Sequence, residues 1–264
     1  MRHFVVATAG LVRREIVRFL RERTRVFGAL VQPILFWAMF GAGLRSSFRP
    51  PVGSGEVGYA EYLFPGTVVL ILLFTAIFST ISLIEDRREG FLQGVLVAPI
   101  PRSGVVFGKI FGGTILALLQ GMLVLACGPL VGVRLSARTV GLSLAILASL
   151  ALALTALSFC IAWRMESTQG FHAIMTVFLM PLWLLSGAFF PAAGGPAWLG
   201  RVMSCNPLTY GVAAFRHALY PADAALRQGI PPAALSVGVT LLFGAAAIIA
   251  ALLLACHRPS GAGT

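Results

Sequence analysis

Six long apolar segments constrain this chain more than any other feature of its sequence. A helix of roughly 20 mostly apolar residues crosses a hydrocarbon core about 30 Å thick. Of the 264 residues, 58% are hydrophobic and 11% are charged, whereas an average soluble domain has about 45–50% and about 25%. The sequence therefore predicts an all-α integral membrane domain with six transmembrane helices, at about 26–44, 63–84, 106–131, 139–163, 168–190 and 234–256.

Residues 1–25 are predicted to form an amphipathic helix that lies in the membrane interface. Apolar residues recur there at helical spacing, and arginines fall on the opposite face. The apolar set is Val5, Val12, Ile16, Phe19 and Leu20, and the basic set is Arg14, Arg18, Arg21 and Arg25. The alternatives are a soluble basic helix and a charge cluster that only sets topology. No convincing cleavage site follows, so we expect this segment to be retained rather than removed as a signal peptide.

Six crossings place both termini on one side of the membrane, and the basic residues indicate which side. Thirteen of the 20 basic residues lie in the terminal segments and the two loops on that side. The excess favours cytoplasmic termini, including a tail at 257–264. The net charge of +11 is better explained by anionic lipid headgroups than by nucleic acid, so membrane lipids are expected partners.

A charged loop follows the second apolar segment, where Glu85 to Glu89 gives five consecutive charged residues. The short amphipathic run 91–97 comes next and is bounded by Gly90 and Pro99. We predict that this loop is a docking surface for a partner protein. Its apolar contacts would be Phe91, Leu92, Val95 and Leu96, with rim charges from Glu85, Arg87, Arg88 and Glu89. For Asp86 and Arg87 individually, simple topogenic anchoring is the alternative.

No stretch of the chain has the pattern of a nucleotide site. Residues 104–110, GVVFGKI, superficially resemble a phosphate loop, but three residues separate the glycines instead of four, and Ile110 stands where Ser or Thr is needed. The chain is therefore predicted to bind no cofactor, and ATP and Mg²⁺ would be held by a partner subunit. Four cysteines without a CxxC spacing are expected to be buried and inert, and no metal site is predicted.

Three further patterns concern packing. Gly104, Gly108 and Gly112 share one helical face, which allows another backbone to approach closely. Gln32 and Pro33 interrupt the first apolar segment, either at a substrate path or at a helix contact. Residues 191–232 mix prolines, glycines and aromatic residues, which favours short helices folded against the membrane over an ordinary amphipathic surface loop.

Four motifs together resemble the type-2 ABC exporter permeases: LFPG at 63–66, EDRREGFLQGVLVAPIPRS at 85–103, GKIFGG at 108–113 and NPLTYGVAAFRHAL at 206–219. The likeness is greatest to the branch with the nodulation lipo-oligosaccharide exporters and the daunorubicin-type drug exporters, in which antibiotic resistance arises by export. The resemblance implies a six-helix permease in the cytoplasmic membrane of a bacterium. It also implies a homodimer, two copies of an ATP-binding cassette subunit, a cytoplasmic coupling helix at 85–103 and re-entrant helices on the external face before the sixth span.

The expected function is ATP-driven export of a hydrophobic or amphipathic molecule, such as a drug, a lipid or a lipid-linked glycan, because few charges lie in the spans. Candidate pathway residues are Gln32, Trp37, Phe64, Thr75, Ser79, Met180 and Trp183, which are polar or aromatic on the first, second and fifth spans. Helix packing is the alternative for each. A proton-coupled transporter would need an ionisable group in mid-membrane, where Gln120 and His172 are the nearest candidates. An integral-membrane enzyme is disfavoured, because the clustered acids alternate with arginines and no catalytic set is evident.

Overall fold

The computed structural model describes residues 2–43, 58–98, 101–191, 196–221, 225–227 and 229–256, which contain helices and connecting turns but no strand. Six helices are long and apolar enough to cross a membrane. They are α2 (Arg23–Gly43), α3 (Tyr59–Arg88), α5 (Arg102–Leu125), α6 (Ala137–Ala162), α7 (Thr168–Trp183) with the turn that continues it to Ala188, and α10 (Ala233–Cys256). The predicted all-α class with six membrane-length helices is confirmed. The predicted tail at 257–264 lies outside the described residues.

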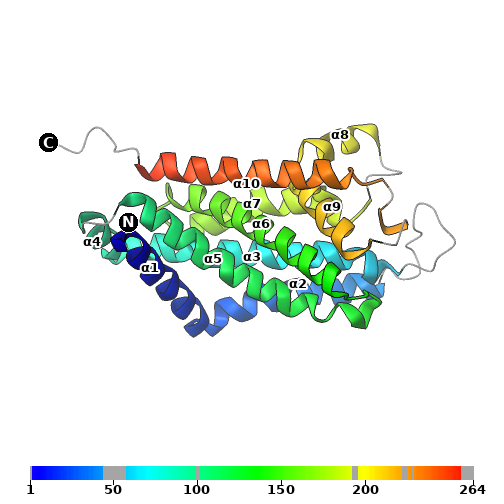
Figure 1. Cartoon of the computed structure of the whole chain (residues 1–264), viewed down its shortest axis with the longest axis horizontal. Helices are drawn as coiled ribbons and strands as arrows, with labels where there is room; N and C mark the ends of the chain where they lie inside the picture. Colours follow the sequence, from blue (N-terminus) through cyan, green and yellow to red (C-terminus); the bar gives the residue numbers. More distant parts are fainter. Residues whose placement is uncertain are drawn as a thin grey trace.

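The six long helices run side by side along the long axis of the molecule (Figure 1). One end, called here the α4 end, carries α1 (Arg2–Arg21), α4 (Phe91–Val97) and the last turn of α10. The opposite end, called the α9 end, carries α8 (Ala197–Cys205) and α9 (Pro207–Leu219). Helix α1 is slanted across the α4 end. The first described residues and the end of α10 therefore lie at the same end of the bundle.

Helix α3 forms the centre of the bundle. Helices α2, α5, α6 and α7 all contact it, and a helix that is apolar on every side is stable only when it is surrounded. Between Tyr62 and Ile84 its side chains are buried, apart from Phe74 and Phe78, which are half-buried. These two rings lie on one helical face and stack with centroids 6.1 Å apart.

The glycine face of α5 brings α1 close, as the four-residue spacing predicts for an approaching backbone. A Cβ atom on Gly108 would lie 2.7 Å from Cβ of Leu11, and one on Gly112 would lie 2.8 Å from Cβ of Glu15. Helix α5 ends at Leu125, followed by a 3₁₀ turn (η1, Gly128–Val131). The predicted third span to residue 131 is therefore too long.

Helix α7 ends in a π-helical turn (η2, Leu184–Ala188), inside which Gly187 has φ 76°. The predicted fifth span extended to residue 190 and missed this break. Carbonyl groups freed at such a break need new donors, and polar side chains near α9 supply them. Asn206 Nδ2 donates to Leu182 O at 2.6 Å, and Thr209 Oγ1 donates to Leu185 O at 3.3 Å. The mixed segment after α7 does form short helices, α8 and α9.

Candidate functional site: a charge network beside α4

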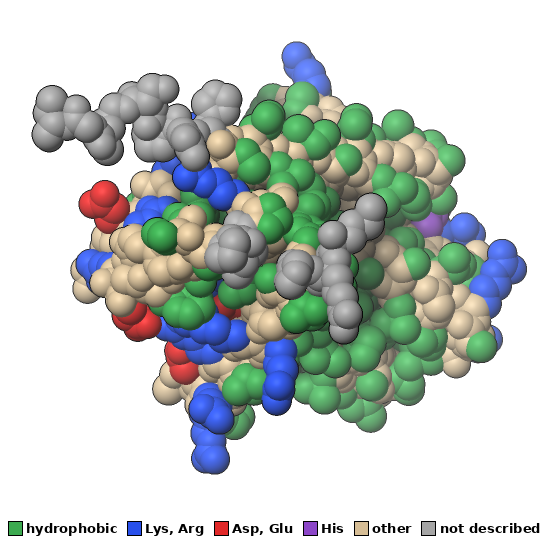
Figure 2. Space-filling view, turned by 60° about the vertical axis from the view of Figure 1, so that its left-hand side comes forward, with side chains coloured by type: hydrophobic (Ala, Val, Ile, Leu, Met, Phe, Trp, Pro, Cys, Tyr) green, Lys and Arg blue, Asp and Glu red, His purple; other side chains and the backbone are tan. Residues whose placement is uncertain are grey.

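Charged side chains of both signs gather on the α4 end, next to a flank that is covered by hydrophobic side chains (Figure 2). Beneath this surface lies a set of paired charges drawn from four helices. We call it the charge network, and it consists of Arg14, Glu15, Arg18, Arg25, Glu85, Asp86 and Lys109. Because α1, α2, α3 and α5 each contribute to it, the network ties the N-terminal helix to three long helices.

Lys109 on α5 is the centre of the network. Its Nζ donates to Glu15 Oε1 at 2.6 Å and to Ser82 Oγ at 3.0 Å, and it also donates to Asp86. The exposed fractions are 6% for Lys109, 4% for Glu15 and 0% for Asp86. A buried ammonium is tolerated when opposite charges and hydrogen bonds surround it. Lys109, the lysine of the apparent phosphate loop, is therefore paired with acids of this chain. It lies in the middle of helix α5 and not in a loop.

Two arginines of α1 complete the shell of Asp86. Arg14 binds this carboxylate with both terminal nitrogens, at 2.9 Å and 2.7 Å. Arg18 donates to Asp86 at 2.6 Å and to Glu85 at 2.8 Å, and Arg25 also pairs with Glu85. The hydrogen bond to Asp86 raises the pKa of the Arg14 guanidinium further above its ordinary value. Three arginines of the predicted polar face therefore pair with acids of α3, and the fourth, Arg21, is exposed.

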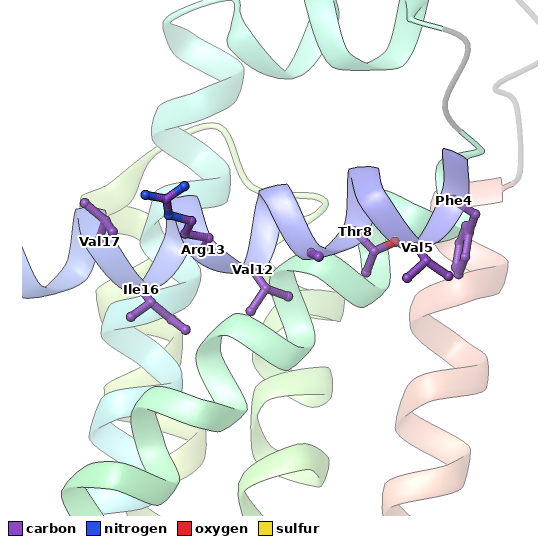
Figure 3. Close-up of a pocket in the computed structure, with 8 residues that line it drawn as sticks. Phe4, Val5, Thr8, Val12, Arg13, Ile16 and Val17 are labelled. Atoms are coloured by element: carbon purple, nitrogen blue, oxygen red, sulfur yellow. The ribbon is translucent and has the colours of Figure 1, made fainter. Parts of the chain in front are cut away.

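The outward face of α1 is apolar. Figure 3 shows Val5, Val12 and Ile16 on this face, with the side chain of Arg13 among them. These residues line an open groove of about 490 Å³. Phe19 departs from the predicted apolar set, because it is 3% exposed and turned toward the bundle. One face of α1 therefore packs against the bundle. Its other face is apolar, and lipid would cover that face if the helix lies in the membrane interface.

Helix α4 begins after Gly90, whose φ of 78° turns the chain sharply out of α3. The ring of Phe91 lies under the Arg14 guanidinium, with the carbon of the guanidinium 3.7 Å from the ring centroid. Such a cation–π contact is worth about 0.5–2 kcal/mol, depending on exposure. It connects the first residue of α4 directly to the charge network. Pro99, predicted to mark the end of this element, lies outside the described residues.

The exposed side of α4 differs from the predicted contact face. Leu92 is 3% exposed and packs in the core, so the prediction that it contacts a partner is wrong. Phe91, Val95 and Leu96 are half-buried, whereas Val97 is 87% exposed. We call the exposed set the α4 outer surface, and it comprises Arg88, Glu89, Gln93, Gly94 and Val97.

Arg87 also differs from its predicted role as a rim charge. Its guanidinium donates to the backbone carbonyls of Met165, at 3.1 Å, and of Trp163. Those carbonyls lie just beyond the end of α6, where a helix leaves acceptors unpaired. Arg87 therefore closes the α6–α7 connection against the end of α3, and Arg88 and Glu89 remain as charges on the outer surface.

Most of the predicted pathway residues pack inside the chain. Four of them are buried: Phe64, Thr75, Ser79 and Trp183. Thr75 Oγ1 donates to Ile71 O at 2.7 Å, and Trp183 Nε1 donates to Gly66 O at 2.8 Å. Trp37 and Met180 are half-buried, and Trp37 Nε1 donates to Ala60 O. Of the predicted set, only Gln32 is exposed.

An apolar surface does exist beside Gln32, on different residues. Helix α2 presents an open groove of about 520 Å³ lined by Gln32 and its apolar neighbours. The half-buried Phe78 of α3 lies 3.7 Å from a Cβ built on Gly28, and its ring is tilted against that of His172 on α7, with centroids 5.6 Å apart. Helix α7 continues the surface with exposed Val177 and Phe178. Thr75 and Ser79 were predicted as pathway residues because they are polar. The half-buried Phe74 and Phe78, on another face of α3, have no feature in the sequence that distinguishes them from core residues.

The cysteines also differ from expectation. Cys127, Cys205 and Cys256 are exposed, and Cys160 is half-buried. None of the four forms a disulfide.

Comparison with known proteins identifies the family of this chain. Residues 7–220 match the model described as ABC-2 type transporter. The chain is 28% identical over 216 residues to the putative transport permease ycf38 of Cyanophora paradoxa, covering 81% of this chain and 74% of the relative. It is 24% identical over 218 residues to the probable doxorubicin resistance ABC transporter permease protein DrrC of Mycobacterium tuberculosis, covering 81% and 77%.

A third relative is the inner membrane transport permease YadH of Escherichia coli K12, 24% identical over 227 residues that cover 82% of this chain and 84% of YadH. The family match covers most of the chain, including α1 from residue 7 onward, the charge network and α4. The chain therefore belongs to the ABC-2 type transporter family, as a multi-pass transmembrane subunit of an ABC transporter.

Proposed function

We propose that this permease exports a hydrophobic or amphipathic molecule across the cytoplasmic membrane of a bacterium, using ATP hydrolysed by a separate subunit. The observation that carries the proposal is the α4 outer surface. This surface has an apolar tip at Val97, and Phe91, the first residue of the helix that carries it, contacts the charge network through Arg14. ATP and Mg²⁺ are assigned to the partner subunit.

The α4 outer surface suits a partner that pushes on the bundle. Coupling between two sites needs differential contacts and a physical connection between them. A load on α4 would reach Arg14 through Phe91 and then Asp86, at the end of α3. Through Lys109 it would reach α5. Because α3 lies at the centre of the bundle, displacement of its end would be felt by the helices around it.

The substrate path is proposed to run along the surface formed by α2, Phe74 and Phe78 of α3, and α7. That surface is apolar, apart from Gln32 and His172. In a homodimer, a second copy would face it with the same surface and close a cavity between the two chains. Two ATP-binding subunits would then dock on the two copies of α4.

The proposed cargo class follows from this apolar wall. The relative DrrC is named for doxorubicin resistance, so a drug-like amphipathic cation is one candidate cargo, and a lipid or lipid-linked glycan is the other. Outward transport is proposed together with cytoplasmic termini. The α4 end, where both the N-terminal helix and the end of α10 lie (Figure 1), would then face the ATP supply.

Reconstitution tests the proposal. The full chain and its co-purified ATP-binding subunit are placed in liposomes, and the transfer of doxorubicin or of a fluorescent phospholipid is followed on addition of ATP or of a proton gradient. We expect ATP-dependent movement of at least one probe away from the leaflet that faces the ATPase. Transport driven by the proton gradient and indifferent to ATP would instead support a proton-coupled transporter.

Two variants separate docking from folding. Val97→Asp places a charge on the apolar tip of the α4 outer surface, so we expect ATP-driven transport and ATPase binding to fall at least about tenfold, equivalent to about 1.4 kcal/mol. Leu130→Asp is the matched control, because Leu130 is 82% exposed in η1 at the opposite end. Unchanged ATPase binding in the Val97→Asp protein, or equal losses in both variants, would contradict docking at α4.

A further inference from the structure

Four charged side chains in the described part of the chain are buried, and one of them has no acid beside it. Glu15, Asp86 and Lys109 belong to the charge network, and the fourth is Arg216 on α9, at 2% exposure. No described carboxylate lies within 4.0 Å of its guanidinium. A buried charge without a counter-charge is strongly disfavoured, so the surroundings of Arg216 need a closer account.

Neutral groups contact part of the Arg216 guanidinium. One terminal nitrogen of Arg216 donates to Tyr62 O at 3.1 Å and to Gly187 O at 3.2 Å. The carbon of the guanidinium lies 4.0 Å from the centroid of the Tyr62 ring. Carbonyl dipoles and a ring face offset part of the cost but supply no full negative charge. A neutral donor would satisfy the same two carbonyls.

The Nε–H group of Arg216 takes part in none of these contacts. It is buried and has no hydrogen-bond partner among the described residues. Arg216 also lines a cavity of about 30 Å³ at the α9 end, together with Ser186, Thr209 and Ile230. A cavity of about 10–15 Å³ already holds one water molecule, so this one has room for a monatomic ion.

We infer that this cavity is a binding site for a small monovalent anion of the halide class, held by Arg216. The anion would accept the hydrogen bond of the Nε–H group and supply a counter-charge that the described residues do not provide. Arg216 joins the start of α3 to the break in α7 through Tyr62 and Gly187. The bound anion would therefore stabilise the packing of α9 against the α9 end of the bundle.

Thermal unfolding of the purified full chain tests the site, with sodium chloride replaced stepwise by sodium gluconate at constant ionic strength. A ligand that binds only the folded state at 100 times its Kd raises the folding equilibrium constant about 100-fold. We expect the midpoint to rise saturably with chloride or bromide. The Arg216→Met variant should lose this dependence, and Arg201→Met, which changes an exposed arginine on α8, should keep it.

Crystals of the unsubstituted chain grown in bromide give an independent readout if Arg216→Met fails to fold, and we expect an anomalous peak beside Arg216. A cavity that holds only water would give equal midpoints in chloride and gluconate and no anomalous peak. That result would overturn the inference. So would a halide dependence that persists in Arg216→Met, or a midpoint raised by phosphate and not by halide.

Discussion

Lys109 is the residue on which the charge network depends, because its ammonium contacts the carboxylates of both Glu15 and Asp86. Lys109→Met would keep most of the side-chain volume and remove one of the two cations that contact both carboxylates, the other being Arg14. A buried charge that loses its partner costs about 3–5 kcal/mol when nothing else compensates it, and the cost here is smaller because Arg14 and Arg18 still contact Asp86. We expect a clear fall in the midpoint of thermal unfolding, followed by tryptophan fluorescence in detergent.

Arg88→Ala is the control for the lysine variant. Arg88 is exposed on the α4 outer surface, and surface changes usually stay within about 0.5 kcal/mol. Equal midpoints for the Lys109→Met and wild-type proteins would show that the pairs of Lys109 contribute nothing to stability.

The charges of the network were visible in the sequence, but their partners were not. Arg14 and Asp86 are 72 residues apart, and helical periodicity says only that Arg14 lies opposite the apolar residues of α1. In water that face would be solvated, whereas here acids at the end of α3 cover it. Thr75 illustrates the reverse error: its polarity suggested a pathway, but hydroxyls in membrane helices commonly turn to a carbonyl of their own helix, as Thr75 does to Ile71 O.

At the scale of elements, the contact between α1 and α5 depends on small residues. Gly112→Leu would place a side chain where Cβ of Glu15 lies only 2.8 Å from the new Cβ. We expect α1 to be displaced and the network to be broken, which would lower the unfolding midpoint and expose α1 to limited proteolysis. Gly141→Leu on α6 is the matched control, because a Cβ there meets nothing within 4 Å.

If the Gly112→Leu protein keeps both its midpoint and its protease resistance, α1 does not pack on this glycine face. The four-residue glycine spacing predicted a close approach, and Gly108 and Gly112 do make one. The spacing could not identify which helix makes the approach. A glycine face allows close packing by any helix. That α1 is the helix which packs there depends on the fold of the whole chain.

Helix α4 shows why a short amphipathic element is hard to orient from sequence. Its seven residues make about two turns, with Phe91, Leu92, Val95 and Leu96 on one side and Val97 on the other. Either side could have faced the bundle. Leu92 turns inward because Gly90 leaves α3 in the left-handed conformation, a torsion angle that the sequence permits but does not fix.

At the scale of the whole molecule, native cysteines report topology. Cys127 and Cys205 are exposed and lie near the α9 end, while Cys256 is exposed at the α4 end. In variants that retain one cysteine each, a membrane-impermeant maleimide added to intact cells should label Cys127 and Cys205. Cys256 should react only after permeabilisation. The opposite pattern would contradict cytoplasmic termini, and labelling of Cys127 and Cys256 from the same side would contradict the proposed crossings.

The number and rough position of the long helices followed from hydropathy, because about 20 apolar residues have few other stable arrangements in lipid. Their ends did not follow as well. The break in α7 depends on Gly187 and on donors from the α9 region, among them Asn206, which lie far along the chain. Resemblance indicated the transporter family, whereas the faces of α2, α3 and α7 that form the proposed path emerged only from packing.

Site-specific photo-cross-linking from α4 tests the central proposal most directly. A photoreactive amino acid is placed at position 97, or at position 92 as the buried control, in the full chain co-expressed with its ATP-binding subunit. We expect irradiation to join position 97 to that subunit and position 92 to segments of the permease itself. Cross-linking of the subunit from position 92 and not from position 97, or from neither while the complex is intact, would contradict docking through the α4 outer surface.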